Sequence, residues 1–97
     1  MAEPRSLTIL FRPGMAPAIR HAIEDELEEA LGDRGEITGG GTAVDLSMCD
    51  ISVEVVDFAT GLRTIREVLQ RLEVPESTLI VEYEPQQVEY PVYESAN

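Results

Sequence analysis

Apolar residues recur at helical spacing in two segments of this chain, and each segment carries them along one side only. The positions are Ile19, Ile23, Leu27, Ala30 and Leu31 in residues 17–31, and Leu62, Ile65, Val68, Leu69 and Leu72 in residues 62–72. A helix with a single apolar stripe buries that stripe against one neighbouring layer and leaves its other side in water. The pattern therefore predicts two helices packed on one face of a sheet.

Three segments alternate between two faces and predict strands of that sheet, namely residues 6–12, 51–56 and 78–83. The expected core face carries Leu7, Ile9, Phe11, Ile51, Val53, Val55, Leu79, Val81 and Tyr83. The second face carries Glu54 and Glu82 together with Leu10, Val56 and Ile80, which form a modest apolar patch there.

Residues 36–44 are ambiguous, because three consecutive glycines, Gly39 to Gly41, interrupt a short strand pattern. Glycine weakens a strand and often marks a bulge or a close approach of backbone. Residues 45–50 read as a turn. Of the helix ends, Pro17 suits a first turn and Gly32 suits a C-terminal stop. Thr60 is a plausible N-cap of the second helix, although Asp57 competes for that role.

The resulting order, β-α-β-β-α-β, predicts an α+β domain of the ferredoxin-like kind over residues 1–84. Its expected strand order is 4-1-3-2, with the glycine strand at one edge. Residues 85–97 form a C-terminal extension, in which residues 88–93 could return as an added edge strand. Pro91 would restrict that strand to an edge or to irregular pairing.

The 97 residues contain 19 Asp and Glu, seven Arg and no Lys, which gives a formal net charge of −12. Such a charge repels nucleic acid and anionic membranes and attracts basic partners. The single cysteine, Cys49, forms no disulfide within the chain. We find no secretory signal and no apolar run of the ~20 residues that a membrane helix needs, so we expect a cytoplasmic protein.

Side chains with catalytic or metal-binding potential are few. His21 is the only histidine, and we interpret it as a solvent-facing residue of the first helix. Cys49 lies between Asp45 and Asp50, whose charges would raise a thiol pKa, so we expect it to be inert. Residues 39–42 lack the following helix and the basic residue of a phosphate loop. The spacing of Asp45 and Asp50 does not match an EF-hand loop. We therefore expect no catalytic residue, cofactor or metal.

The cluster of acidic residues near the first helix is the one sequence feature that distinguishes this chain from an ordinary small soluble domain. Seven of them fall between positions 24 and 36, and a solvated, solubilising face is the plain interpretation of such a cluster. The functional interpretation is electrostatic docking to a basic protein. For that role the sequence predicts the partner-binding residues Glu24, Asp25, Glu28, Glu29, Asp33 and Glu36.

Residues 11–14 (Phe-Arg-Pro-Gly), 35–42 (Gly-Glu-Ile-Thr-Gly-Gly-Gly-Thr) and 50–54 (Asp-Ile-Ser-Val-Glu) resemble, in this order, small stand-alone bacterial ferredoxin-like proteins of uncharacterised role. That resemblance covers about residues 6–84. In size and charge the chain also resembles immunity proteins of bacterial polymorphic toxins, without a motif that would transfer binding residues. The second resemblance implies a stoichiometric inhibitor that occupies a toxin surface or active site.

Two function classes follow from the sequence. The first is a non-enzymatic module that binds a basic protein, such as an immunity protein or inhibitor of a toxin or of a nucleic-acid-binding protein. The second is a small ferredoxin-like ligand-binding protein or enzyme that forms a homodimer through the open sheet face, with a pocket there. In that setting Glu54 or Glu82, partly buried in a cleft, could have a raised pKa and act as an acid or base.

Overall fold

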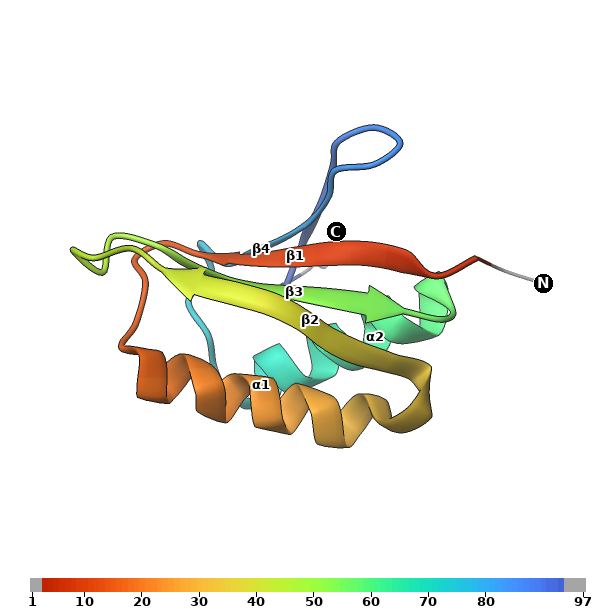
Figure 1. Cartoon of the computed structure of the whole chain (residues 1–97), viewed down its shortest axis with the longest axis horizontal. Helices are drawn as coiled ribbons and strands as arrows, with labels where there is room; N and C mark the ends of the chain where they lie inside the picture. Colours follow the sequence, from red (N-terminus) through yellow and green to blue (C-terminus); the bar gives the residue numbers. More distant parts are fainter. Residues whose placement is uncertain (1–2, 94–97) are drawn as a thin grey trace.

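Two helices cover one face of a five-stranded antiparallel sheet in the computed structural model, which describes residues 3–93 (Figure 1). The strands are β1 (Arg5–Phe11), β2 (Gly35–Thr42), β3 (Cys49–Val55), β4 (Leu79–Glu82) and β5 (Val88–Pro91). The helices are α1 (Pro17–Leu31) and α2 (Phe58–Arg71), and a 3₁₀ turn, η1 (Gly32–Arg34), follows α1. The α+β class predicted from the sequence is confirmed.

The strand order is β2-β3-β1-β4-β5, and every neighbouring pair is antiparallel. The glycine strand β2 lies at one edge of the sheet, as predicted. The start of the C-terminal extension forms β5, which pairs with β4 at the opposite edge. Beyond it, Val92 is buried and the Tyr93 hydroxyl donates to the carbonyl oxygen of Val74 at 2.6 Å. Residues 94–97 of the predicted extension lie outside the described residues.

The core lies between the sheet and the helices. Its side chains come from alternate positions of the strands and from one side of each helix, and the largest of those fully buried include Leu7, Ile9, Phe11, Leu27, Leu31, Ile51, Ile65, Leu69 and Ile80. Two members of the predicted stripes lie outside this core, because Ile19 is 55% exposed and Leu72 is 39% exposed. Ile19 lies in the first turn of α1, and Leu72 directly follows the last residue of α2.

The predicted faces of the fourth strand are wrong. Ile80 pairs with Ile9 across β1 and β4, so Ile80 points into the core and is fully buried. Leu79 and Val81 therefore point to the other face, and Tyr83 is 48% exposed. A four-residue strand with apolar residues at three successive positions carries no clear alternation, and the pairing with β1 decides its faces. The predicted apolar patch of Leu10, Val56 and Ile80 does not form.

Helix α1 has the predicted bounds, and Gly32 follows its last residue with a φ of 56°. Helix α2 begins at Phe58, four residues before the predicted start, because Asp57 is its N-cap. The Asp57 carboxylate accepts a hydrogen bond from the backbone N–H of Thr60 at 2.9 Å. Thr60 is thus a first-turn residue and not the cap. The same contact lowers the pKa of Asp57.

Replacing Asp57 with alanine should lower the melting temperature by roughly 4–8 °C, because the Thr60 N–H loses its acceptor at the start of α2. Thermal unfolding followed by circular dichroism at neutral pH measures this shift. The matched control is Asp57→Asn, whose side-chain oxygen still accepts from Thr60. Equal losses in both variants would show that the charge of Asp57, and not the cap, is responsible.

Candidate functional site

Two of the five acids in α1 are engaged in ion pairs. Glu24 Oε2 lies 2.5 Å from Nη1 of Arg20, one helical turn away. Arg20 also reaches the edge strand, because its Nε donates to the Thr42 hydroxyl at 3.0 Å. Glu26 Oε2 lies 3.1 Å from Nη2 of Arg71 and links the two helices. Both carboxylates therefore serve the packing of α1 against its neighbours.

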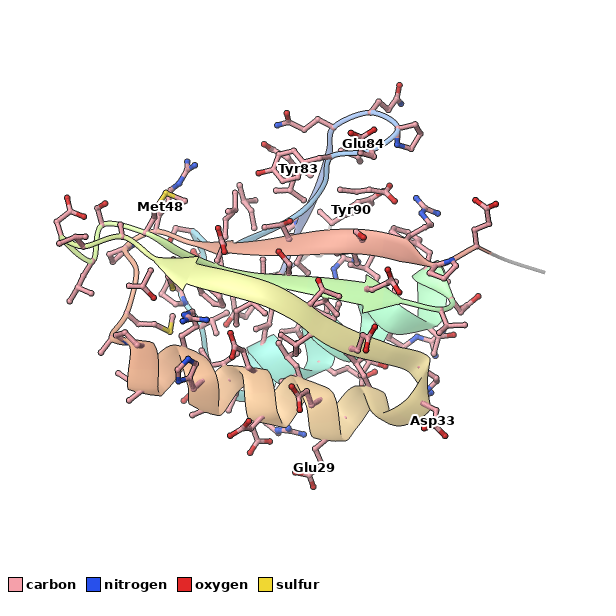
Figure 2. All side chains as sticks on the ribbon, viewed as in Figure 1. Glu29, Asp33, Met48, Tyr83, Glu84 and Tyr90 are labelled. Carbon is pink, nitrogen blue, oxygen red and sulfur yellow. The ribbon has the colours of Figure 1, made fainter. Side chains whose placement is uncertain are left out.

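The other three acids of α1 face solvent. Asp25, Glu28 and Glu29 are exposed, and within residues 3–93 none of them forms an ion pair. Figure 2 shows Glu29 on the side of α1 that points away from the sheet. We refer to Asp25, Glu28 and Glu29 as the free acidic face. Its three charges are available to a partner without the loss of an internal contact.

Asp33 and Glu36 lie beyond the end of α1. Glu36 pairs with Glu54 across β2 and β3, and both side chains are on the sheet face opposite the helices. Asp33, Glu36 and Glu54 line a shallow hollow of about 370 Å³. The structure thus divides the six predicted residues between the helix layer and the end of the sheet, and does not gather them on one flat surface.

No group of three His, Cys, Asp or Glu side chains is arranged to hold a metal ion in the part of the chain that the structure describes. His21 is exposed, as predicted, with Nε2 3.4 Å from Nη2 of Arg20. Cys49 is 2% exposed at the start of β3. Burial is the main cause that raises the pKa of its thiol, and the charges of Asp50 and Glu24 act in the same direction.

The glycine strand contains the predicted bulge, since the β2–β3 register shifts between Ile37 and Gly39. Gly40 follows it at a crowded position. A Cβ atom at Gly40 would lie 2.7 Å from Nη1 of Arg20 and 3.0 Å from Oε2 of Glu24. The missing side chain therefore allows the Arg20–Glu24 pair to lie directly against the edge strand.

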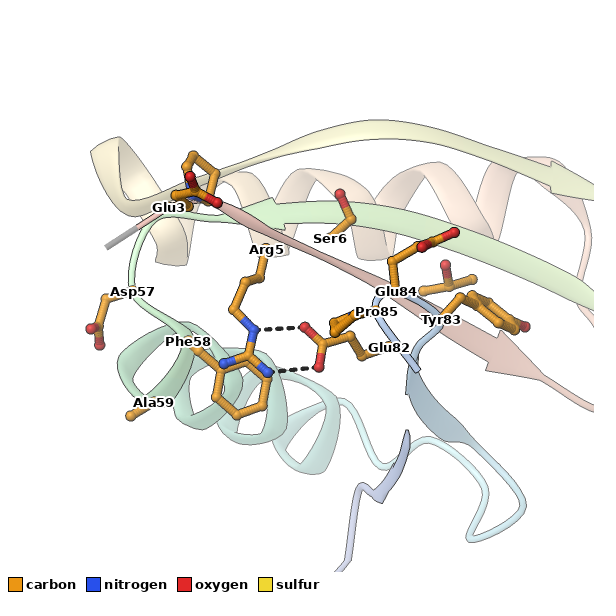
Figure 3. A pocket seen from close by; sticks show the side chains of 12 residues that line it. Glu3, Arg5, Ser6, Asp57, Phe58, Ala59, Glu82, Tyr83, Glu84 and Pro85 are labelled. Carbon is orange, nitrogen blue, oxygen red and sulfur yellow. Dashed lines mark hydrogen bonds and ion pairs between the residues drawn. The ribbon is translucent and has the colours of Figure 1, made fainter. Parts of the chain in front are cut away.

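A second feature, which the sequence analysis missed, is a hollow of about 920 Å³ beside the start of β1. Figure 3 shows Arg5 and Glu82 facing each other within it. Arg5 donates from Nε to Oε2 and from Nη2 to Oε1 of Glu82, both at 2.6 Å. The Arg5 guanidinium also lies 3.8 Å from the centroid of the Phe58 ring, and that ring packs against Tyr90.

Glu82 differs from its predicted role in a dimer cleft. It lies on the helix side of the sheet and is 3% exposed. The hydrogen bonds from Arg5 lower its pKa, and burial opposes that shift only in part. The expectation of a raised pKa at Glu82 is therefore wrong. Its partner is 77 positions away, so no local sequence pattern could have identified the pair.

Neither helix of the described chain is long and apolar enough to cross a membrane. Comparison with known protein families, with curated proteins and with solved structures finds no match.

Proposed function

We propose that this chain is a non-enzymatic, acidic protein-binding module that docks on a basic protein, in the manner of an immunity protein or another stoichiometric inhibitor. The free acidic face carries this proposal. Three neighbouring carboxylates are exposed on one helix without internal partners, on a chain with a net charge of −12. The basic target is a toxin or a protein whose basic surface normally meets nucleic acid.

The free acidic face is a better docking surface for a basic partner than the paired acids are. Glu24 and Glu26 are already neutralised by Arg20 and Arg71. A cationic partner would have to compete with those arginines, whereas at Asp25, Glu28 and Glu29 it displaces only water and counterions. Fields of this kind accelerate association and weaken as salt rises, because the Debye length falls to ~8 Å at physiological ionic strength.

We further propose that the scaffold is a ferredoxin-like sheet extended by one strand. Read from the other side, its first four strands follow the order β4-β1-β3-β2, and β5 is added beyond β4. This order supports the assignment, as does the placement of both helices on one face (Figure 1). We also propose that the protein acts in the cytoplasm, since its lone cysteine offers no intrachain disulfide.

Charge reversal of the free acidic face tests the proposed function. The variant D25K/E28K/E29K should lose the partner that the wild type captures from extracts of the source cell at about 50 mM salt, with affinity reduced roughly 10- to 100-fold. The captured protein should be basic, stoichiometric and largely released at about 300 mM salt. Affinity is then measured by titration calorimetry with that purified partner.

The matched control reverses three exposed acids elsewhere, E76K/E84K/E89K, which changes the net charge by the same amount. Figure 2 shows Glu84 on the hairpin far from α1. This control should retain most of the binding. Equal losses of affinity in the two variants would show that net charge alone causes the effect. Undiminished binding by D25K/E28K/E29K would show that the free acidic face is not the docking surface.

The hollow at Arg5 favours a second candidate function, binding of a small molecule. Its volume of about 920 Å³ falls in the range of small-molecule sites, which is roughly 300–1,000 Å³. It opens on residues of the uncovered sheet face, such as Ser6 and Thr8. A dimer in light scattering, together with a ligand that raises the melting temperature of the wild type but not of a Thr8→Lys variant, would favour this candidate.

A further inference from the structure

The two edge strands of the sheet differ in how they are protected against pairing with another strand. At the β5 edge the strand has four residues and ends in Pro91. Side chains of α2 bind its backbone there, because Arg66 Nε donates to the carbonyl oxygen of Pro91 at 2.9 Å and Gln70 Nε2 donates to that of Val92 at 2.8 Å. Proline and capped carbonyls are the usual means of preventing another strand from pairing at an edge.

The β2 edge is interrupted by the bulge between Ile37 and Gly39, but the stretch beyond it, Gly39 to Thr42, has neither form of protection. β2 is eight residues long and contains no proline or lysine. The loop after it closes with a hydrogen bond from Ala43 N–H to the carbonyl oxygen of Met48 at 2.9 Å. Hydrogen-bonded and non-hydrogen-bonded residue pairs alternate along antiparallel strands. Counted from the Ala43–Met48 bond, Gly41 is hydrogen-bonded to Asp50, whereas the backbone N–H and C=O groups of Gly40 and Thr42 point away from β3.

Gly40 is exposed and Thr42 is half-buried, and the Arg20–Glu24 pair packs against them only from the helix side. Cβ atoms built at Gly39 and Gly41 would have no neighbour within 4 Å, so the uncovered face of the sheet is bare beside this stretch. In residues 3–93, no hydrogen bond from outside the β2–β3 pair reaches the backbone of Gly40 or Thr42. The edge from Gly39 to Thr42 is therefore open to a second strand.

The charges around this edge select the strand that would add there. On the helix side, the ion-paired side chains of Arg20 and Glu24 lie against the Gly40 position, and Arg20 also binds the Thr42 hydroxyl, so their charges cancel there. On the uncovered side, Glu36 is exposed. Figure 1 shows α1 running beneath β2, and the carboxylates of Glu36 and of Asp50, which is opposite Gly41, lie on the side that α1 does not cover. Side chains of an added strand alternate between these sides, so lysine or arginine at every second position would meet the carboxylates of the uncovered side.

We infer that an extended, basic segment of the partner adds to β2 as a sixth strand of the sheet, bonded to the backbone of Gly40 and Thr42. This inference rests on the proposed function and names the part of the partner that the edge would take. A second copy of the chain fits less well, because its own acids and its net charge of −12 would meet the same acids.

A pair of synthetic peptides tests the inference. The probe is an end-capped peptide of about seven residues that alternates lysine and valine. Its twin has the same sequence and charge but carries N-methyl groups on alternate amides, which prevents strand pairing on that edge. Binding of each to the full chain is followed by ¹⁵N–¹H NMR and by amide hydrogen exchange.

The unmethylated peptide should bind roughly tenfold more tightly than its twin, since it alone gains the backbone hydrogen bonds. It should also slow the exchange of the Gly40 and Thr42 amides, which exchange faster than those of Gly39 and Gly41 in the free protein. Equal affinities, with shifts confined to the free acidic face, would overturn strand addition and leave the proposed function standing. Strand addition by the partner would also be overturned if neither peptide bound, or if β2 paired with a second copy of the chain in concentrated solution. The partner capture described above tests the proposed function separately.

Discussion

Replacing Gly61 with alanine is expected to lower the free energy of unfolding by about 1–3 kcal/mol. Gly61 lies in the first turns of α2, where the helix packs against β3. A Cβ atom at this position would lie 2.6 Å from both Cβ and Cγ1 of Val55, a fully buried strand residue. Contacts of that length force the helix away from the sheet and open the packing around Ile65 and Leu69 behind it.

The sign of this result distinguishes packing from helix propensity. Alanine favours a helix over glycine by about 1 kcal/mol, so a Gly61→Ala variant without the clash would be more stable than the wild type. Urea unfolding followed by circular dichroism measures the change. Gly41→Ala is the matched control, because its Cβ meets no neighbour within 4 Å, and it should stay within about 0.5 kcal/mol of the wild type. A stabilised Gly61→Ala protein would contradict the close approach of α2 to β3.

Glu82→Gln is expected to lower the free energy of unfolding by about 1–3 kcal/mol at neutral pH. The buried carboxylate accepts two hydrogen bonds from Arg5, and the uncharged amide cannot accept both in the same geometry. The variant also loosens the stacking of the Arg5 guanidinium on Phe58, which the ion pair holds in place. Glu76→Gln, an exposed carboxylate, is the control and should be nearly neutral.

The effect of Glu82→Gln should depend on pH in one direction. Arg5 lowers the pKa of Glu82 in the folded protein, so the contribution of the carboxylate to stability is complete above its unfolded pKa of about 4.3. It is lost as the pH falls through the lower folded pKa. The difference in unfolding free energy between wild type and variant should therefore be constant near neutrality and shrink in acid. A difference that grows in acid would contradict the ion pair.

The elements of this fold that could be predicted are those with long, regular patterns. Helix α1 has the predicted bounds because Pro17, a one-sided stripe and Gly32 all agree on them. The edge position of β2 followed from the expected strand order, and its glycines indicated a bulge or a close approach of backbone. The faces of β4 could not be predicted, since Leu79, Ile80 and Val81 are all apolar and only the pairing of Ile80 with Ile9 selects the core face.

The candidate sites divide in the same way. Clustered acids on α1 were visible in the sequence because neighbours in a helix are neighbours in the chain. Which of them stay free was not visible, because Glu26 meets Arg71 from the second helix, 45 positions away. The hollow at Arg5 was missed altogether, since it joins β1, the start of α2 and the β4–β5 hairpin. Long-range contacts of this kind leave no local periodicity.

The central position of β1 has a consequence for how the chain is made. Of the five strands of this sheet, β1 is synthesised first, yet its partners begin at Cys49 in β3 and at Leu79 in β4. Its three core residues, Leu7, Ile9 and Phe11, therefore stay unpaired until about half of the chain has been synthesised. Through α1 the nascent chain carries six acids against three arginines, and repulsion between such chains on neighbouring ribosomes would disfavour pairing of their exposed strands until β3 arrives.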